Sequence, residues 1–162
     1  MENKIYPVKG KIIFLDVDGV IATPNQIKKY AQEHGKSCPP GLPQIDPICM
    51  EFLKRLVDEF DAKIVVSSAW RKLKHDMFDL IKICSVYGIP IVGKTASLPS
   101  GHRGEEIVDY MKRHAVSIND ICILDDSIEH MEPFDKTYIA RTDPFMGIDE
   151  NSFEKAREIL LR

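Results

Sequence analysis

The sequence of 162 residues lacks features that mark several special classes of protein. No apolar run approaches the roughly 20 residues that a membrane-spanning helix needs. The first residues, MENKIYPVKGK, contain no apolar segment of a secretory signal. Lysine and arginine do not outnumber the acidic residues, and the formal net charge of −3 indicates no general nucleic-acid-binding surface. We therefore expect a cytoplasmic protein without membrane contact.

Cysteine is also scarce, and its spacing excludes the regular metal and redox motifs. The four cysteines are Cys38, Cys49, Cys84 and Cys122, and none belongs to a CxxC pair. Cys84 and Cys122 lie inside apolar runs, where a thiol behaves as a small hydrophobe. We interpret the cysteines as free thiols of a reducing compartment. A zinc site of His34, Cys38 and Cys49 is the alternative, although its spacing matches no regular motif.

The sequence does contain an alternation of short apolar runs and amphipathic stretches. Five runs are rich in isoleucine and valine and show little polar alternation, as in strands covered on both faces: residues 11–15, 62–67, 89–92, 121–124 and 137–140. Helical periodicity lies between and after them, in about residues 46–60, 77–84, 105–115 and 152–161. Asp46 and Pro47 predict the start of the first of these helices, and Asn151 with Glu154 resembles a capping box for the last.

This order of elements predicts an α/β fold. We expect a three-layer, Rossmann-like parallel sheet of about five strands with helices on both faces, formed by residues 1–162 as a single domain. Residues 24–47 differ from the rest, because a short helix candidate, NQIKKYAQEHG, is followed by the proline-rich KSCPPGLPQIDP. We interpret residues 24–47 as a small insert after the first strand, a minimal cap over a site.

Polar side chains follow the predicted strands at their carboxyl ends, where ligands bind in open parallel sheets. These residues are Asp16, Asp18 and Gly19, then Ser67, Ser68, Trp70 and Arg71, then Asp125, Asp126 and Ser127, and finally Arg141, Thr142 and Asp143. Four carboxylates in one small pocket would repel one another, and a divalent cation would relieve that repulsion. Oxygen ligands of this kind suit Mg²⁺, so we predict a Mg²⁺ site of Asp16, Asp18, Asp125 and Asp126.

Several of these stretches together resemble the motifs of one enzyme superfamily. FLDVDGV resembles the first motif of the haloacid dehalogenase (HAD) superfamily, KIVVSSAW the second and ILDDS the fourth. Arg103 in GHRGEEI matches the cation of the third motif, and the motifs follow the superfamily's order over about residues 11–145. Within the superfamily, SSAWR, RGEEI and RTDPFMGI are similar to the small HAD domains of RNA-repair-associated, Swiss Army Knife-like bacterial proteins.

The resemblance implies a Mg²⁺-dependent phosphatase that forms an aspartyl-phosphate. It implies that Asp16 is the nucleophile and that Asp18 is the general acid and then the general base. It further implies that Ser67 holds a phosphoryl oxygen and that Arg103 steadies the phosphoryl charge. Asp125, with Asp126 nearby, would complete the Mg²⁺ site beside Asp16 and the backbone carbonyl of Asp18.

Further residues are expected to contact the substrate, and some of them have a structural alternative. The expected contacts are Gly19, Ser68, Arg71, Lys94 and Thr142. Lys94 also competes with Arg103 as the third-motif cation; we favour Arg103 because residues at a helix start point into the crevice and arginine binds phosphate through two donors. Arg71 is equally well explained as a solvated helix residue, and Asp125–Asp126 as the cap of a helix that starts at Ser127.

Two other functions remain as alternatives to a phosphatase. A phospho-receiver domain also uses an acidic cluster, although its motifs come in a different order and it lacks the counterpart of Asp18. A catalytically silent binding module would keep the fold without the chemistry. The expected partner is a phosphorylated small molecule or the end of a macromolecule. A nucleic-acid end would need a local basic strip, for which Arg71, Lys72, Lys74 and Arg103 are the candidates.

Overall fold

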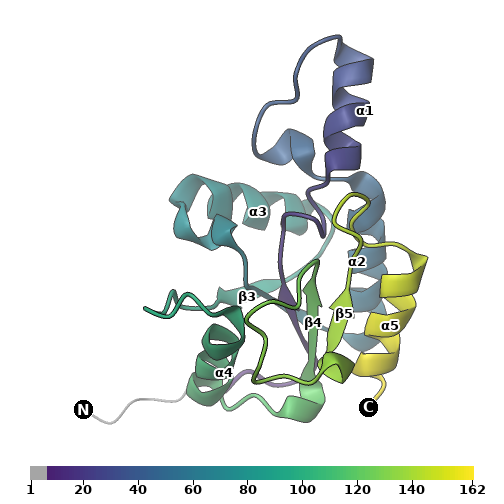
Figure 1. The fold of residues 1–162 in the computed structure, drawn as a ribbon. Coiled ribbons are helices and arrows are strands. Elements are labelled where there is room, and N and C mark those ends of the chain that lie inside the picture. Colours follow the sequence, from purple (N-terminus) through teal and green to yellow (C-terminus); the bar gives the residue numbers. More distant parts are fainter. Residues whose placement is uncertain (1–6) are drawn as a thin grey trace.

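The structure, a computed structural model, describes residues 7–162 and contains one parallel five-stranded sheet (Figure 1). The strands are β1 (Ile12–Leu15), β2 (Lys63–Val66), β3 (Ile91–Lys94), β4 (Ile121–Asp125) and β5 (Ile139–Arg141). Their order in the sheet is β3-β2-β1-β4-β5, so β1 and β4 are neighbours at its centre. The register pairs Leu15 with Leu124, which brings the residues after both strands to the same edge.

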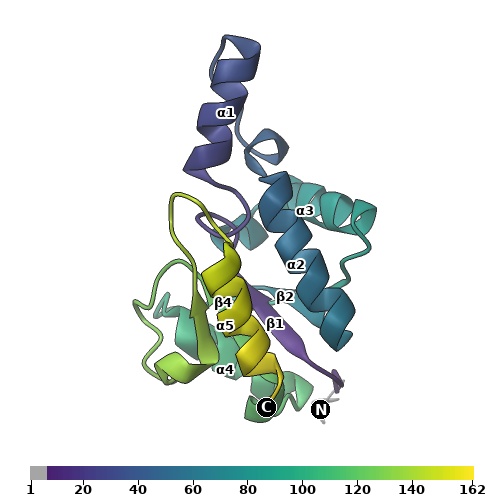
Figure 2. The same cartoon turned by 90° about the vertical axis from the view of Figure 1, so that its right-hand side faces the viewer.

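Helices cover both faces of the sheet, and the predicted three-layer α/β fold is confirmed. The longer helices after the insert are α2 (Pro47–Phe60), α3 (Lys74–Val86), α4 (Arg103–His114) and α5 (Glu150–Leu160). Short 3₁₀ helices are η1 (Leu42–Gln44), η2 (Ala69–Lys72), η3 (Ile118–Asp120) and η4 (Lys136–Tyr138). Figures 1 and 2 show α2 and α5 on one face of the sheet and α4 on the other.

The side chains of β1 divide between two apolar clusters, as expected for a strand that is covered on both faces. Ile13 and Leu15 pack in the cluster that α2, α3 and α5 complete, whereas Ile12 and Phe14 pack in the cluster on the side of α4. The sheet is therefore held from both sides, and its central strands cannot shift without disturbing both clusters.

The edge strand β3 differs from the prediction. It was expected over residues 89–92 and covered on both faces, but it spans Ile91–Lys94 and is only half covered, with Val92 41% exposed. The physical reason is that β3 lies at the edge of the sheet, where β2 is its partner among the described strands. At Gly93 a Cβ atom would lie 2.7 Å from the Tyr110 hydroxyl, so the side chain of α4 crosses the strand where glycine leaves room.

The start of α5 also differs from the prediction. The helix begins at Glu150, and its N-cap is Asp149 rather than Asn151. The Asp149 carboxylate accepts from the Ser152 backbone N–H at 2.8 Å, and the Ser152 hydroxyl contacts the Asp149 backbone N–H at 3.0 Å. An aspartate with a serine three residues later satisfies both backbone donors, so the N-cap lies two residues earlier than the Asn151–Glu154 pair indicates.

The segment 24–47 contains helix α1 (Pro24–His34) and η1. The Thr23 hydroxyl caps α1 by accepting from the Gln26 backbone N–H, and Gly35 ends the helix in the left-handed conformation. No residue of α1 is buried, and the helix extends away from the sheet (Figures 1 and 2). The chain returns where the Asp46 N–H donates to the Ile21 carbonyl, and further anchors are the Asn25 N–H, which donates to the Phe145 carbonyl, and Leu42, which packs against the core.

The cysteines are free thiols, and three of them are buried. Burial raises the pKa of Cys49, Cys84 and Cys122 to about 12, so these side chains stay protonated at neutral pH. The Cys49 thiol faces the Met146 carbonyl, and within residues 7–162 it forms no metal-ligating group with His34 and Cys38. No helix in this part of the chain combines the length and the apolar character that crossing a membrane requires.

The loop after β5 packs so closely on the base of the insert that Gly147 has no room for a side chain. Gly147 has φ +73°, and a Cβ atom there would overlap the Val20 carbonyl and lie 2.7 Å from the Cys49 sulfur. We expect Gly147→Ala to lower the free energy of unfolding by roughly 2–5 kcal/mol, because left-handed strain and overpacking add. Urea unfolding checks this.

Gly35 provides the matched control for Gly147. Its φ is +63°, and no atom lies within 4 Å of a Cβ added there. We expect Gly35→Ala to cost only the conformational part, about 1–2 kcal/mol. Equal losses at the two positions would contradict close packing at Gly147.

Candidate active site

The two central strands deliver two buried aspartates to one point at the carboxyl edge of the sheet. Asp16 follows β1 and Asp125 ends β4. The Asp16 backbone N–H donates to the Leu124 carbonyl at 2.9 Å, which continues the pairing of the two strands through this position. Asp16 is 6% exposed and Asp125 is 2% exposed. Neighbouring parallel strands therefore place two carboxylates side by side in a region that is largely shielded from water.

Arg103 lies between these carboxylates. Its Nη1 atom is 3.0 Å from Asp16 Oδ1 and 2.7 Å from Asp125 Oδ2. Arg103 is the first residue of α4, and the next residue, Gly104, donates its N–H to the His130 carbonyl at 2.8 Å. A Cβ atom at residue 104 would lie 2.8 Å from Pro133, so a glycine lets the helix start approach this loop and aim Arg103 at the strand ends.

The geometry favours Arg103 over Lys94 as the cation of this site. Lys94 ends the edge strand β3, is exposed, and lies with its Nζ atom 3.4 Å from the Arg71 carbonyl. No contact between Lys94 and the central aspartates is present in residues 7–162. The edge position of β3 explains this, because β2 lies between β3 and β1, the strand that leads to Asp16.

A third carboxylate joins the pair. Oxygen atoms of Asp16, Asp125 and Asp126 lie within 4.8 Å of one another. The pKa of Asp16 is raised to about 7, mainly by burial and also by the charge of Asp125, while the Arg103 guanidinium opposes both effects. Burial likewise raises the pKa of Asp125. An all-oxygen donor set with partly compensated charge has the composition that Mg²⁺ prefers.

Asp18 was included in the predicted metal site, but its carboxylate lies outside this cluster. The side chain is exposed and accepts a hydrogen bond from Trp70 Nε1 at 3.1 Å. The Asp18 carboxylate is thus held by an indole N–H and is not one of the three grouped carboxylates, Asp16, Asp125 and Asp126.

Gly19 gives the acidic cluster its space. Its φ is +76°, and a Cβ atom there would lie 2.5 Å from Asp126 Oδ2. Any other residue would push the Asp126 carboxylate away. Glycine at this position therefore leaves room for the Asp126 carboxylate.

Ser67 presents a buried hydroxyl that has no partner. It directly follows β2, its N–H donates to the Leu15 carbonyl at 2.8 Å, and it is 1% exposed. Its Oγ atom makes no hydrogen bond within residues 7–162. A buried hydroxyl without a partner costs about 1–3 kcal/mol, so a native site that keeps one is expected to satisfy it with a ligand.

Three other expected substrate contacts, Ser68, Arg71 and Thr142, are buried and hydrogen-bonded within the protein, and their contact with a substrate stays a prediction. The Ser68 hydroxyl caps η2, and the Thr142 hydroxyl donates to the Gly19 carbonyl at 2.7 Å. Arg71 pairs with Glu106 of α4. The sequence shows that these polar residues follow strands, but only the fold shows which of them have internal partners.

The aspartates and Arg103 line a cavity of about 220 Å³. Its other lining residues are Gly101, Asp126, Ser127, Glu129 and His130. The alternative that Asp125–Asp126 caps a helix does not hold, because the Ser127 N–H donates to Asp125 Oδ1 at 3.0 Å within a loop. Glu129 and His130 were missed, since a turn in this loop carries no motif. Glu106 was also missed, although it lies one helical turn after Arg103.

Comparison with known families agrees with this geometry. A family model described as "HAD domain in Swiss Army Knife RNA repair proteins" matches residues 12–153. The chain belongs to this family. At the superfamily level this assigns a HAD-type hydrolase domain to the chain, and the predicted resemblance is confirmed. Comparisons with curated proteins and with solved structures gave no match.

The raised pKa of Asp16 predicts how stability depends on pH in metal-free protein. The folded state keeps a proton on Asp16 up to about pH 7, whereas the unfolded chain releases it near its ordinary value of 3.8. The folded state therefore binds more protons between these values, and the free energy of unfolding should fall as pH rises, by at most about 1.4 kcal/mol per pH unit for one proton.

Urea unfolding between pH 4.5 and 8 in the presence of a chelator would measure this slope. Asp16→Asn removes the titrating group and should flatten the slope relative to the unmodified protein. Parallel curves for the two proteins would show that Asp16 titrates at its ordinary pKa.

Proposed function

We propose that the protein is a Mg²⁺-dependent phosphomonoester hydrolase that works through a phosphorylated Asp16. The observation that carries this proposal is the placement of Arg103 between Asp16 and Asp125, with the unpartnered hydroxyl of Ser67 at the end of the neighbouring strand. A guanidinium and a free hydroxyl beside a carboxylate provide a nucleophile and two groups that bind phosphoryl oxygens.

The acidic cluster fits a divalent cation. Asp16, Asp125 and Asp126 would hold it. The pKa of Asp16 and of Asp125 is raised mainly by burial and further by neighbouring carboxylates, and a cation would favour the ionised forms of both. When bound, Mg²⁺ would neutralise phosphoryl oxygens and keep Asp16 ionised at neutral pH.

The proposed hydrolysis proceeds in two steps, in which Asp16 and Asp18 have different roles. In the first, an Asp16 oxygen bonds to phosphorus while the bond from phosphorus to the leaving oxygen breaks and Asp18 gives that oxygen its proton. In the second, Asp18 takes a proton from water, the water oxygen bonds to phosphorus, and the Asp16–phosphorus bond breaks. Inorganic phosphate leaves, and both aspartates return to their initial state. The hydrogen bond from Trp70 Nε1 would orient the Asp18 carboxyl group for these transfers.

Substitution of the two aspartates tests this division. We expect Asp18→Asn to lower kcat for p-nitrophenyl phosphate by roughly 10²–10⁴-fold, because general acid–base catalysis contributes that much. Asp16→Asn should abolish turnover, and a chelator should abolish that of the unmodified protein. Release of phosphate measures each rate.

Asp58→Asn is the control for these variants, because Asp58 pairs with Lys54 on the exposed surface of α2. It should leave kcat unchanged. Turnover by Asp16→Asn at the unmodified rate would reject the aspartyl-phosphate route.

We further propose that the substrate phosphate lies on the end of a large molecule, with a nucleic-acid end as the first candidate. The family description names RNA repair proteins, and the insert leaves the carboxyl edge open because α1 extends away from it. Of the predicted basic strip, Arg71 is buried and Arg103 lies in the site, whereas Lys72 and Lys74 are exposed at the end of η2 and the start of α3. A phosphorylated small molecule is the competing substrate.

Terminally phosphorylated oligonucleotides distinguish these substrates. If Lys72 and Lys74 contact the strand, Lys72→Met with Lys74→Met should raise KM for the oligonucleotide. The double variant should also reduce the salt slope by about 0.7 per lost contact with a single strand. Its kinetics with p-nitrophenyl phosphate should not change. Failure to bind or hydrolyse the oligonucleotide at low salt would reject the nucleic-acid end and favour a small molecule.

A further inference from the structure

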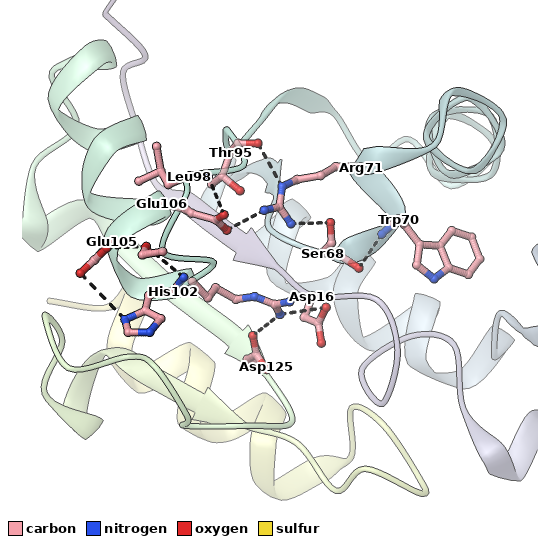
Figure 3. A network of polar contacts seen from close by, with 12 residues as sticks. Asp16, Ser68, Trp70, Arg71, Thr95, Leu98, His102, Glu105, Glu106 and Asp125 are labelled. Atoms are coloured by element: carbon pink, nitrogen blue, oxygen red, sulfur yellow. Dashed lines mark hydrogen bonds and ion pairs between the residues drawn. The ribbon is translucent and has the colours of Figure 1, made fainter.

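A buried ion pair, Arg71 with Glu106, lies next to the site without belonging to it (Figure 3). Both side chains are 4% exposed. Arg71 belongs to η2, which follows β2, and Glu106 belongs to α4. The pair therefore joins two segments that are separated in the sequence and that each carry one group of the proposed phosphoryl site.

Both members of the pair also form hydrogen bonds with the surrounding backbone. Arg71 Nε donates to the Thr95 carbonyl at 3.1 Å, and its Nη1 atom donates to the Ser68 carbonyl at 2.7 Å. Glu106 accepts from Arg71 through Oε2 and from the Leu98 N–H through Oε1 at 3.0 Å. These contacts connect the end of β2, the end of β3 and the loop before α4 to one helical residue.

Stability alone does not explain such a pair. Desolvation of two charges offsets much of their attraction, and replacement of a buried ion pair by apolar residues is often neutral or stabilising. The helix also has an apolar attachment, since Ile107 and Tyr110 pack in the cluster below it. The ion pair adds a geometric constraint. The planar guanidinium of Arg71 bonds to Thr95, Ser68 and Glu106, and this fixes the positions of these three residues relative to one another.

That placement concerns the two proposed phosphoryl ligands. Arg103 lies one helical turn before Glu106, and Ser67 lies four residues before Arg71, at the start of the same loop. We propose that the Arg71–Glu106 pair is a positioning device that sets the distance between the Arg103 guanidinium and the Ser67 hydroxyl. This inference rests on the proposed function, because it assigns a catalytic consequence to that distance.

The test replaces both charges together, so that neither is left buried and unpaired. In the double variant Arg71→Met, Glu106→Met, we expect kcat for p-nitrophenyl phosphate to fall about 10- to 100-fold, because misplacement by about 1 Å has effects of this size. KM should change less than kcat. The exposed pair Arg157–Glu59, which links α5 to α2 on the other face of the sheet, is the control, and Arg157→Met, Glu59→Met should retain kcat.

Thermal unfolding separates positioning from stability. A structural role alone predicts that a double variant with an unchanged Tm keeps its kcat, whereas a positioning role predicts the loss of kcat at unchanged Tm. If the double variant does not fold, Glu106→Gln replaces it, because the amide retains the shape and one acceptor. It should lower kcat at least several-fold.

A crystal structure of the variant gives a readout that does not depend on activity. We expect the distance between Arg103 Cζ and Ser67 Oγ to change by about 1 Å or more, the displacement that matters for catalysis. An unchanged distance, or an unchanged kcat, would overturn the positioning role. If the unmodified protein hydrolyses no phosphomonoester, the proposed function fails, and the crystallographic distance alone decides whether the pair positions these groups.

Discussion

The site depends on one guanidinium held between two buried carboxylates. Asp16 and Asp125 come from adjacent central strands, and without a cation their charges would oppose each other in a region of low polarity. Arg103 contacts both and lowers their pKa against the effect of burial. Because Arg103 is the first residue of α4, the electrostatic balance of the strand ends depends on where that helix starts.

The surrounding polar residues fall into two groups that have different consequences. Thr142, Ser68 and Arg71 have internal partners and hold loops in place, whereas the hydroxyl of Ser67 has none in the described part of the chain. Buried polar groups are normally satisfied, and in the described part of the chain the hydroxyls of Ser67, Thr95 and Tyr110 are exceptions. Of these, Ser67 directly follows β2, the neighbour of the strand that leads to Asp16, so its hydroxyl is the one best placed to meet a ligand oxygen at the acidic cluster. This contrast supports a phosphoryl site at Ser67 more strongly than its position after a strand does.

Membership of the HAD family and the physical chemistry of the site lead to the same reaction class by separate routes. The family match rests on the sequence of residues 12–153, whereas the grouping of Asp16, Asp125, Asp126 and Arg103 rests on coordinates. Helix α1 of the insert extends away from the sheet, and none of its residues is buried (Figure 2).

The fold and the centre of the site could be predicted because both follow from local patterns. Apolar runs between amphipathic stretches specify a parallel sheet, and parallel strands deliver whatever follows them to a common edge, so Asp16 and Asp125 had to meet. Boundaries were less predictable. The half-covered β3 and the cap of α5 depend on neighbours such as Tyr110 and Ser152, which local periodicity does not reveal.

The sequence by itself determined the strands, the acidic residues at their ends and the family to which the chain belongs. Only the tertiary structure decided that Asp18 turns to Trp70, that Arg71 is buried against Glu106 and that the Ser67 hydroxyl lacks a partner. The physical reason is that a polar residue's role depends on its partners. The partners of Asp18 and Arg71 lie 52 and 35 residues away, beyond the reach of any local pattern.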